Sequence, residues 1–133
     1  MFLIQFDACN RELLNIGSIG FVIYYDNIVL IKHYQILNKS YDNNYAEYSA
    51  LINALQYAKK LNIKDLYVEG DAKIVIDQIN NECKINCDHI KPLFNQVYQL
   101  KKHFDFINFE HIYRRYNNYA DSLANHALIE YFN

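Results

Sequence analysis

The chain has 133 residues, 52% of them hydrophobic, which is enough for one compact domain, spanning residues 1–133, with a buried core. Its formal net charge of −2 argues against a large basic surface of the kind that binds polyanions without specificity. No segment is apolar over enough residues to span a membrane, and no feature of the sequence points to an obligate protein partner.

Three cysteines, an odd number without a secretory signal, predict a reducing intracellular compartment, the cytoplasm by default, with the nucleus or an organelle still possible. Cys83 and Cys87 are four residues apart and His89 is close to them in sequence. A zinc site would need a fourth ligand and closer cysteine spacing, so zinc is the less favoured interpretation.

Three strands are predicted at the start of the chain, over residues 2–8, 19–25 and 28–37, because Ile, Val and Tyr dominate there. Asp26-Asn27 fits a two-residue hairpin turn between the second and third of these segments. Short links between consecutive strands predict an antiparallel meander.

Helical spacing of small and aliphatic residues follows from Ala46 to Leu61, and Asn43-Asn44 can cap this helix. The remaining elements are predicted as a strand at 66–68, helices at 74–79 and from about Pro92, a strand at 106–113 and a helix at 118–131. This order predicts an α/β fold. Its mixed five-stranded sheet combines the antiparallel meander with parallel strands and carries helices on both faces.

Four acidic residues stand where a folded core disfavours charge: Asp7, Glu47, Asp71 and Asp121. Asp7 ends the first apolar run, and Asp71 follows a strand expected to run parallel to it, so both belong at the carboxyl edge of the sheet. Glu47 lies in the first predicted turn of its helix and Asp121 opens the last helix. Clustered buried carboxylates are costly unless neutralised, and hard divalent cations are the usual neutralising group.

Each acid also has an ordinary structural explanation. Asp7 could be a strand-to-turn residue, Asp71 could cap the helix that follows it, and Glu47 and Asp121 could favour their helix N-termini. Together these explanations require four coincidences at one end of one sheet, which favours a shared site.

Three segments carry a resemblance to a known family. Residues 43–48 read Asn-Asn-Tyr-Ala-Glu-Tyr, residues 68–73 read Val-Glu-Gly-Asp-Ala-Lys, and residues 111–121 run from His to Asp through Arg, Asn and Ala. They resemble the Asn-Asn-x-Ala-Glu-Tyr box, the strand-Gly/Thr-Asp-Ser box and the His-Val-x-Arg-x-x-Asn-x-x-Ala-Asp ending of type 1 ribonuclease H. The ending is that of the branch with a shortened final loop.

The resemblance implies a ribonuclease H-like fold and hydrolysis of the RNA strand of RNA·DNA hybrids, leaving 5′-phosphate and 3′-hydroxyl ends. It also implies two Mg²⁺ ions, for which Mn²⁺ can substitute, about 4 Å apart on the reacting phosphate. Asp7 would bridge both ions, Asp121 would complete the ion that activates water, and Glu47 and Asp71 would hold the other ion.

Substrate contacts implied by the same resemblance come from three places. Asn43 and Asn44 would contact the minor groove, and Arg114 would contact a phosphate near the scissile bond or help the product to leave. Backbone near Asp7 would help to recognise the ribose 2′-hydroxyl, so Cys9 and Asn10 are included as contacts.

The chain departs from the family pattern in two segments. Ala8-Cys9-Asn10 follows Asp7 where the family has a glycine and a glycine-rich turn, and residues 82–89 are short, carry no Trp and lack a basic handle. Arg114 stands where other members carry a loop histidine. Two alternatives therefore stay open, which are another carboxylate nuclease on this fold and a non-catalytic nucleic-acid-binding domain.

Overall fold

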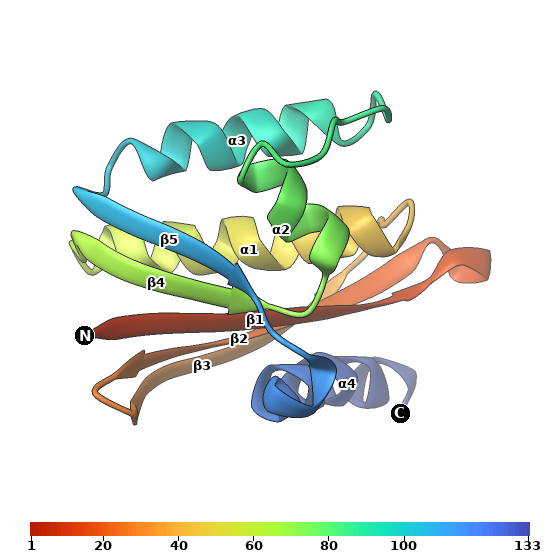
Figure 1. Cartoon of the computed structure of the whole chain (residues 1–133). Coiled ribbons are helices and arrows are strands. Elements are labelled where there is room, and N and C mark those ends of the chain that lie inside the picture. Colours follow the sequence, from red (N-terminus) through yellow and green to blue (C-terminus); the bar gives the residue numbers. More distant parts are fainter.

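The computed structural model describes all residues 1–133 and contains one five-stranded sheet and four α-helices (Figure 1). The elements in chain order are β1 (Phe2–Arg11), β2 (Ile16–Tyr25), β3 (Ile28–Leu37), α1 (Asn43–Lys60), β4 (Asp65–Gly70), α2 (Lys73–Ile79), α3 (Lys91–Lys101), β5 (Phe106–His111) and α4 (Asn118–Phe132). None of these helices has both the length and the apolarity needed to cross a membrane.

The sheet has the strand order β3-β2-β1-β4-β5 and is divided into two halves by β1. β1, β2 and β3 pair antiparallel, whereas β1, β4 and β5 pair parallel. The predicted mixed sheet of a meander plus parallel strands is therefore confirmed, and the fold is the ribonuclease H-like α/β fold.

Helices cover both faces of the sheet, as the sequence predicted. α1, α2 and α3 lie on one face, and α4 lies alone on the other, where it packs against β1, β2 and β3 (Figure 1). The main core lies between the sheet and α1, where Ile4, Phe6, Phe21, Tyr48 and Leu55 are fully buried.

The hairpin turn between β2 and β3 forms at Asp26-Asn27, as predicted. Both residues have positive φ angles, 48° and 68°, which suits a tight two-residue turn. The predicted end of the first strand was wrong, however, because antiparallel pairing of β1 with β2 continues to Arg11. Polar residues interrupt the apolar alternation of β1 beyond residue 8, so the sequence pattern ends before the strand does.

Close contact between α4 and β2 depends on Gly20. A Cβ atom at this position would lie 2.6 Å from the carbonyl oxygen of Ala120 and 2.6 Å from the amide nitrogen of Ala124. Both are backbone atoms of α4, so they can move away only if the helix itself moves. The absence of a side chain at Gly20 therefore sets how closely α4 approaches the sheet.

Gly20→Ala is expected to lower the free energy of unfolding by about 1–3 kcal/mol, because the added methyl group overpacks this contact. Chemical denaturation monitored by circular dichroism measures the effect. Gly17→Ala in the same strand is the matched control, since its Cβ would meet its nearest atoms at 3.0 Å, and it should cost less. Equal stability of the Gly20→Ala protein and the wild type would contradict this account.

Candidate active site at the carboxyl edge of the sheet

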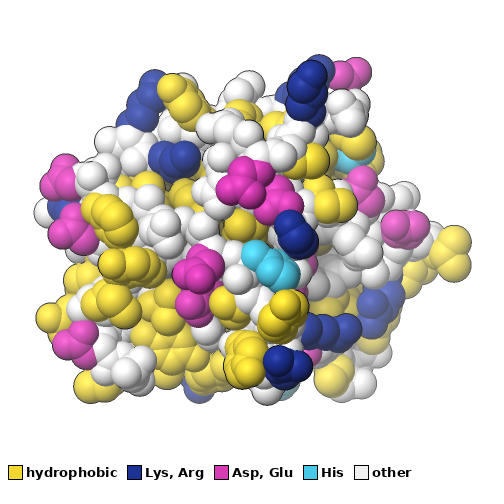
Figure 2. Space-filling model, viewed as in Figure 1, with side chains coloured by type: hydrophobic (Ala, Val, Ile, Leu, Met, Phe, Trp, Pro, Cys, Tyr) yellow, Lys and Arg dark blue, Asp and Glu magenta, His cyan; other side chains and the backbone are white.

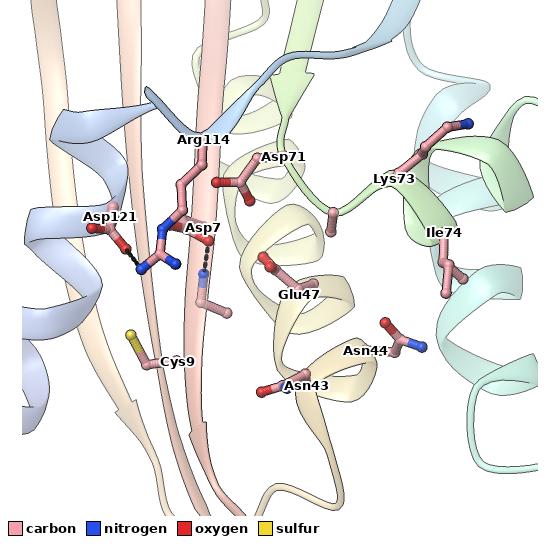
Figure 3. A pocket seen from close by; sticks show the side chains of 12 residues that line it. Asp7, Cys9, Asn43, Asn44, Glu47, Asp71, Lys73, Ile74, Arg114 and Asp121 are labelled. Carbon is pink, nitrogen blue, oxygen red and sulfur yellow. Dashed lines mark hydrogen bonds and ion pairs between the residues drawn. The ribbon is translucent and has the colours of Figure 1, made fainter. Parts of the chain in front are cut away.

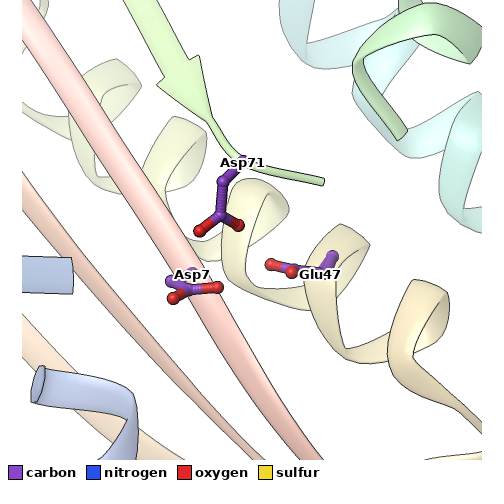
Figure 4. A group of neighbouring side chains, drawn as sticks. All are labelled: Asp7, Glu47 and Asp71. Atoms are coloured by element: carbon purple, nitrogen blue, oxygen red, sulfur yellow. The ribbon is translucent and has the colours of Figure 1, made fainter. Parts of the chain in front are cut away.

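Three carboxylates from three different elements meet beside the end of β4. Parallel pairing of β1 with β4 ends at Phe6 and Gly70, and the next residue of each chain segment is acidic, Asp7 and Asp71. Glu47 comes from α1, and one oxygen from each of the three carboxylates lies within 4.8 Å of the others. Their side chains point toward one another across the gap between β1, β4 and α1 (Figure 4).

The close spacing of these three carboxylates favours a bound metal ion over a site without one. Asp7 is only 4% exposed and Glu47 only 9%, so water screens their charges poorly. The Oε1 atom of Glu47 is buried and has no hydrogen-bond partner in the protein. A buried acceptor without a donor, next to two further carboxylates, fits the oxygen ligand set of a hard divalent cation.

The pKa values of the three carboxyl groups also favour a site that binds a cation. Burial, together with the charge of Asp71, raises the pKa of Asp7 to about 8. Burial, followed by the charge of Asp7, raises the pKa of Glu47 well above its usual value. Burial also raises the pKa of Asp71, although a hydrogen bond from Asn117 and the charge of Arg114 oppose the change. Without a cation, the site therefore favours protonated carboxyl groups.

The fourth acid, Asp121, lies in the first turn of α4 on the far side of β1 from Glu47 (Figure 3). It lines the same cleft but is not one of the three residues whose oxygens lie within 4.8 Å. Its Oδ1 is 3.9 Å from Nη2 of Arg114, whose own side chain is 81% exposed. Such an exposed ion pair is weak, so Arg114 is free to turn toward a bound phosphate.

The cleft around these acids has a volume of about 530 Å³. Its lining residues are Asp7, Ala8, Cys9, Asn43, Asn44, Glu47, Asp71, Ala72, Lys73, Ile74, Arg114 and Asp121. The structure thus brings together all of the residues expected at the site except Asn10. Asn10 lies farther along β1 and lines a separate hollow with Arg11 and the turn at Glu12–Leu14.

Several local details differ from the sequence-based expectations. Asp42, and not the Asn43-Asn44 pair, caps α1, because its Oδ1 accepts a 2.8 Å hydrogen bond from the Tyr45 amide. Since α1 begins at Asn43, Glu47 lies in its second turn rather than its first. The alternative role of Asp71 as a helix cap is wrong, because the N-cap of α2 is Ala72 and no side chain caps it.

A second contact holds the N-terminus of α1. Nε2 of His89, in the segment between α2 and α3, lies 2.8 Å from Oδ2 of Asp42. The capping residue is therefore tied both to its own helix and to a segment that is distant in sequence. This contact positions the turn that carries Asn43 and Asn44.

The sequence analysis did not identify two residues at the site. One lines the cleft and the other supports the strand that carries Asp7. Lys73 lines the cleft at the start of α2, and its Nζ is 2.7 Å from Oδ2 of Asp77. Asn117 is fully buried, and its Nδ2 donates a 2.8 Å hydrogen bond to the Phe6 carbonyl oxygen, one residue before Asp7. Lys73 was detectable as a basic residue two positions after Asp71. Asn117 is the Asn of the ending at residues 111–121, but its contact with Phe6, 111 positions away, is visible only in the structure.

Asn117 connects the elements that carry three of the four acids. It bonds to β1 beside Asp7, it opposes the rise that burial causes in the pKa of Asp71, and its carbonyl oxygen accepts a 3.1 Å hydrogen bond from the Asp121 amide. A buried side-chain hydrogen bond is specific in direction, so these contacts fix the end of β1 relative to the start of α4. We regard Asn117 as a positioning residue.

For a reaction catalysed at this candidate site, Asn117→Ala is expected to lower kcat by at least about 10-fold with a much smaller change in KM, because the acids lose their relative positions but remain present. It also leaves the Phe6 carbonyl without a partner, which should destabilise the fold by about 1–3 kcal/mol. Steady-state kinetics and thermal melts measure both effects. Asn118→Ala is the control, since Asn118 is exposed. A wild-type kcat for Asn117→Ala would contradict the positioning role.

Comparison with known proteins gives matches along nearly the whole chain. A family described as reverse transcriptase-like matches residues 5–127. Ribonuclease HI of Halobacterium salinarum is 29% identical over 124 residues, which are 92% of this chain and 62% of that protein. The bifunctional protein Rv2228c of Mycobacterium tuberculosis is 38% identical over 86 residues, or 65% of this chain and 24% of that protein. The chain thus spans less than two thirds of these curated relatives.

Solved structures agree with the sequence matches. The crystal structure of RNase H1 from H. salinarum superposes with a TM-score of 0.92 at 28% identity, covering 97% of this chain and 98% of that one. The N-terminal RNase H domain of Rv2228c superposes with a TM-score of 0.90 at 31% identity, covering 97% and 94%. LC11-RNase H1, in complex with an RNA/DNA hybrid, has a TM-score of 0.92 over 100% of both chains. At 24% identity, its likeness concerns the fold alone.

Proposed function

Because the chain belongs to the reverse transcriptase-like family and has the fold of type 1 ribonucleases H, we propose that it hydrolyses the RNA strand of RNA·DNA hybrids endonucleolytically. The products would carry 5′-phosphate and 3′-hydroxyl ends. The observation that carries this proposal is the meeting of Asp7, Glu47 and Asp71 within 4.8 Å at the edge of an open cleft. The structure of LC11-RNase H1 in complex with an RNA/DNA hybrid makes this fold compatible with such a substrate.

The carboxylates are proposed to hold two divalent cations, Mg²⁺ or Mn²⁺, which when bound activate water and neutralise charge on the attacking and leaving oxygens. Asp7 has the central position, between Asp71 and Glu47 on one side and Asp121 on the other, so it is assigned the bridging role (Figures 3 and 4). Glu47 and Asp71 are assigned to the cation that would stabilise the leaving oxygen, and Asp121 is assigned to the cation that would activate water. Burial of Asp7 and Glu47 keeps bulk water from competing for these oxygens.

Substrate contacts are proposed for the rim of the cleft. Asn43 and Asn44 present amide groups at the N-terminus of α1, where they can bond to base edges or 2′-hydroxyls in a minor groove. Arg114, drawn between Asp121 and Asp71 in Figure 3, and Lys73, drawn beyond Asp71 and Glu47, can each contact a phosphate. Cys9 lines the cleft beside Asp7 and is proposed as a backbone contact, because its Sγ lies 3.4 Å from Oδ1 of Asn125.

The direct test is cleavage of end-labelled RNA·DNA, RNA·RNA and DNA·DNA duplexes of one sequence, each with Mg²⁺, with Mn²⁺ and with EDTA. We expect cleavage of the RNA strand of the hybrid only, dependent on the metal, with ends that a 5′-phosphate-specific exonuclease accepts. Cleavage of the DNA duplex would identify another carboxylate nuclease. Binding of the hybrid without cleavage in either metal would identify a non-catalytic domain.

A further inference from the structure

An exposed aromatic and cationic surface lies on the connection between β5 and α4. The guanidinium carbon of Arg115 is 5.4 Å from the ring centre of Tyr113 and 5.0 Å from that of Tyr116. The ring of His111 packs edge-on against Tyr113, with 5.8 Å between ring centres. We refer to Tyr113, Arg115 and Tyr116 as the tyrosine platform.

Nothing in the fold accounts for the side chains of the tyrosine platform. Tyr113 is 65% exposed and Tyr116 61% exposed, so neither contributes to the core. None of the ion pairs in the structure involves Arg115. Residues 111–120 contain no Asp or Glu, in a chain whose net charge is negative. The platform is thus a local surface of positive charge and solvent-exposed aromatic rings.

The backbone beneath the platform is held in place. The Tyr116 amide donates a 2.9 Å hydrogen bond to the Tyr113 carbonyl, which closes a turn of 3-10 helix at Arg114–Tyr116. The Asn117 amide donates to the Arg114 carbonyl at 3.0 Å, and the buried Asn117 side chain anchors the segment to β1. A rigid support keeps the ordering cost of binding at the platform low.

The platform adjoins the catalytic cleft through Arg114. Arg114 lines the cleft and reaches toward Asp121, whereas its neighbours Tyr113 and Arg115 belong to the platform. In Figure 2, Lys/Arg and hydrophobic side chains gather together below the centre of the face drawn. A strand that leaves the cleft past Arg114 would therefore meet the platform next.

Stacking chemistry decides which part of a nucleic acid fits this surface. Inside a duplex both faces of each base are covered by neighbouring base pairs, so an exposed tyrosine ring finds no free face there. An unpaired base does offer a free face, and aromatic rings and arginine planes stack on it while the guanidinium also attracts phosphate. The absence of acidic residues from this segment favours an anionic partner, and the exposed tyrosine rings favour a strand with unpaired bases over an acidic protein.

We propose that the tyrosine platform binds unpaired nucleotides of a single strand that continues from the end of the hybrid. The proposal rests on the proposed function, because the strand belongs to the same substrate. It predicts that the protein prefers hybrids that adjoin a single-stranded segment over blunt hybrids of equal length. The platform then acts as a substrate-binding surface separate from the metal site.

Fluorescence anisotropy with catalytically disabled Asp71→Asn protein tests the preference. The probes are one labelled RNA·DNA duplex in blunt form and the same duplex with a six-nucleotide tail at each of the four possible ends. At least one tailed probe is expected to bind about 5- to 50-fold more tightly than the blunt probe. Tyr113→Ala combined with Tyr116→Ala should remove that gain and leave the affinity for the blunt probe unchanged.

Tyr98→Ala is the matched control. Tyr98 lies on α3 and is 52% exposed, and the Nζ of Lys102 is 5.0 Å from the centre of its ring. It has the same aromatic and cationic character outside the cleft and should keep the tail preference. KM values of the catalytically competent protein on tailed and blunt hybrids give a second measurement that does not depend on Asp71→Asn. The tailed hybrid should have the lower KM, and the double tyrosine variant should abolish the difference.

Three results separate the failure of this inference from the failure of the proposed function. Cleavage of the blunt hybrid with no preference for any tail would overturn the role of the platform and leave the nuclease assignment standing. A tail preference that survives in the double tyrosine variant would overturn it equally. No cleavage of any hybrid, together with tail binding that the double tyrosine variant loses, would overturn the nuclease assignment and support the platform.

Discussion

Asp71→Asn is expected to lower kcat/KM for hybrid cleavage by at least about 100-fold, because it removes one anionic ligand while keeping the shape of the side chain. Asp71 directly follows β4, and its carboxylate faces Asp7 and Glu47. A neutral amide oxygen at this position binds a divalent cation far more weakly than a carboxylate does. Cleavage rates at saturating Mg²⁺ measure the loss.

The fold of the Asp71→Asn protein should remain intact. Burial raises the pKa of Asp71, so its charge is unfavourable in the metal-free protein, and removing it should leave the melting temperature in EDTA equal or higher. Asp88→Asn is the matched control, since it deletes the same charge from a side chain that is 97% exposed and should keep full activity. Near-wild-type cleavage by Asp71→Asn at saturating metal would remove Asp71 from the ligand set.

The metal-free protein is expected to lose stability as the pH rises from 5 to 8. The pKa of Asp7 is about 8 in the folded protein, against 3.8 as its ordinary value, so between these two values the folded state binds the proton more tightly. The unfolded state therefore releases a proton within this window, and each increase in pH favours unfolding. Glu47 acts in the same direction, because burial also raises its pKa.

The expected difference between pH 5 and pH 8 is about 2–4 kcal/mol in the free energy of unfolding, or roughly 7–14 °C in melting temperature. Thermal melts in EDTA at several pH values measure it. Mg²⁺ or Mn²⁺ should reverse the loss at pH 8, because a cation that binds only the folded state stabilises it and competes with protons for the same oxygens.

Asp7→Asn is the decisive comparison for this pH effect. Without the ionisable group at the centre of the cluster, the decline in stability toward pH 8 should be smaller, and so should the gain from added metal. Asp65→Asn, at the exposed start of β4, should behave like the wild type. If Asp7→Asn and the wild type gain equally from metal at pH 8, Asp7 does not organise the site.

The sequence by itself determined the order of the elements and the existence of an acidic site. The order of elements follows from patterns that repeat within a few residues, such as the strand alternation before Asp26 and the helical spacing after Ala46. Asp7 and Asp71 could be placed together because the ends of parallel strands share one edge of a sheet. These are local patterns or general rules of topology, and both can be applied without coordinates.

Only the tertiary structure decided how the site is assembled. It showed that Glu47 Oε1 is buried without a partner, that Asp121 stands apart from the other three acids, and that Asn10 lies elsewhere. It also showed Asn117 linking β1 to α4. The position of Asp121 and the link through Asn117 depend on the distance of α4 from the sheet, which the missing side chain at Gly20 permits. Contacts between residues about a hundred positions apart leave no periodic signal in a single sequence, because packing alone brings such residues together.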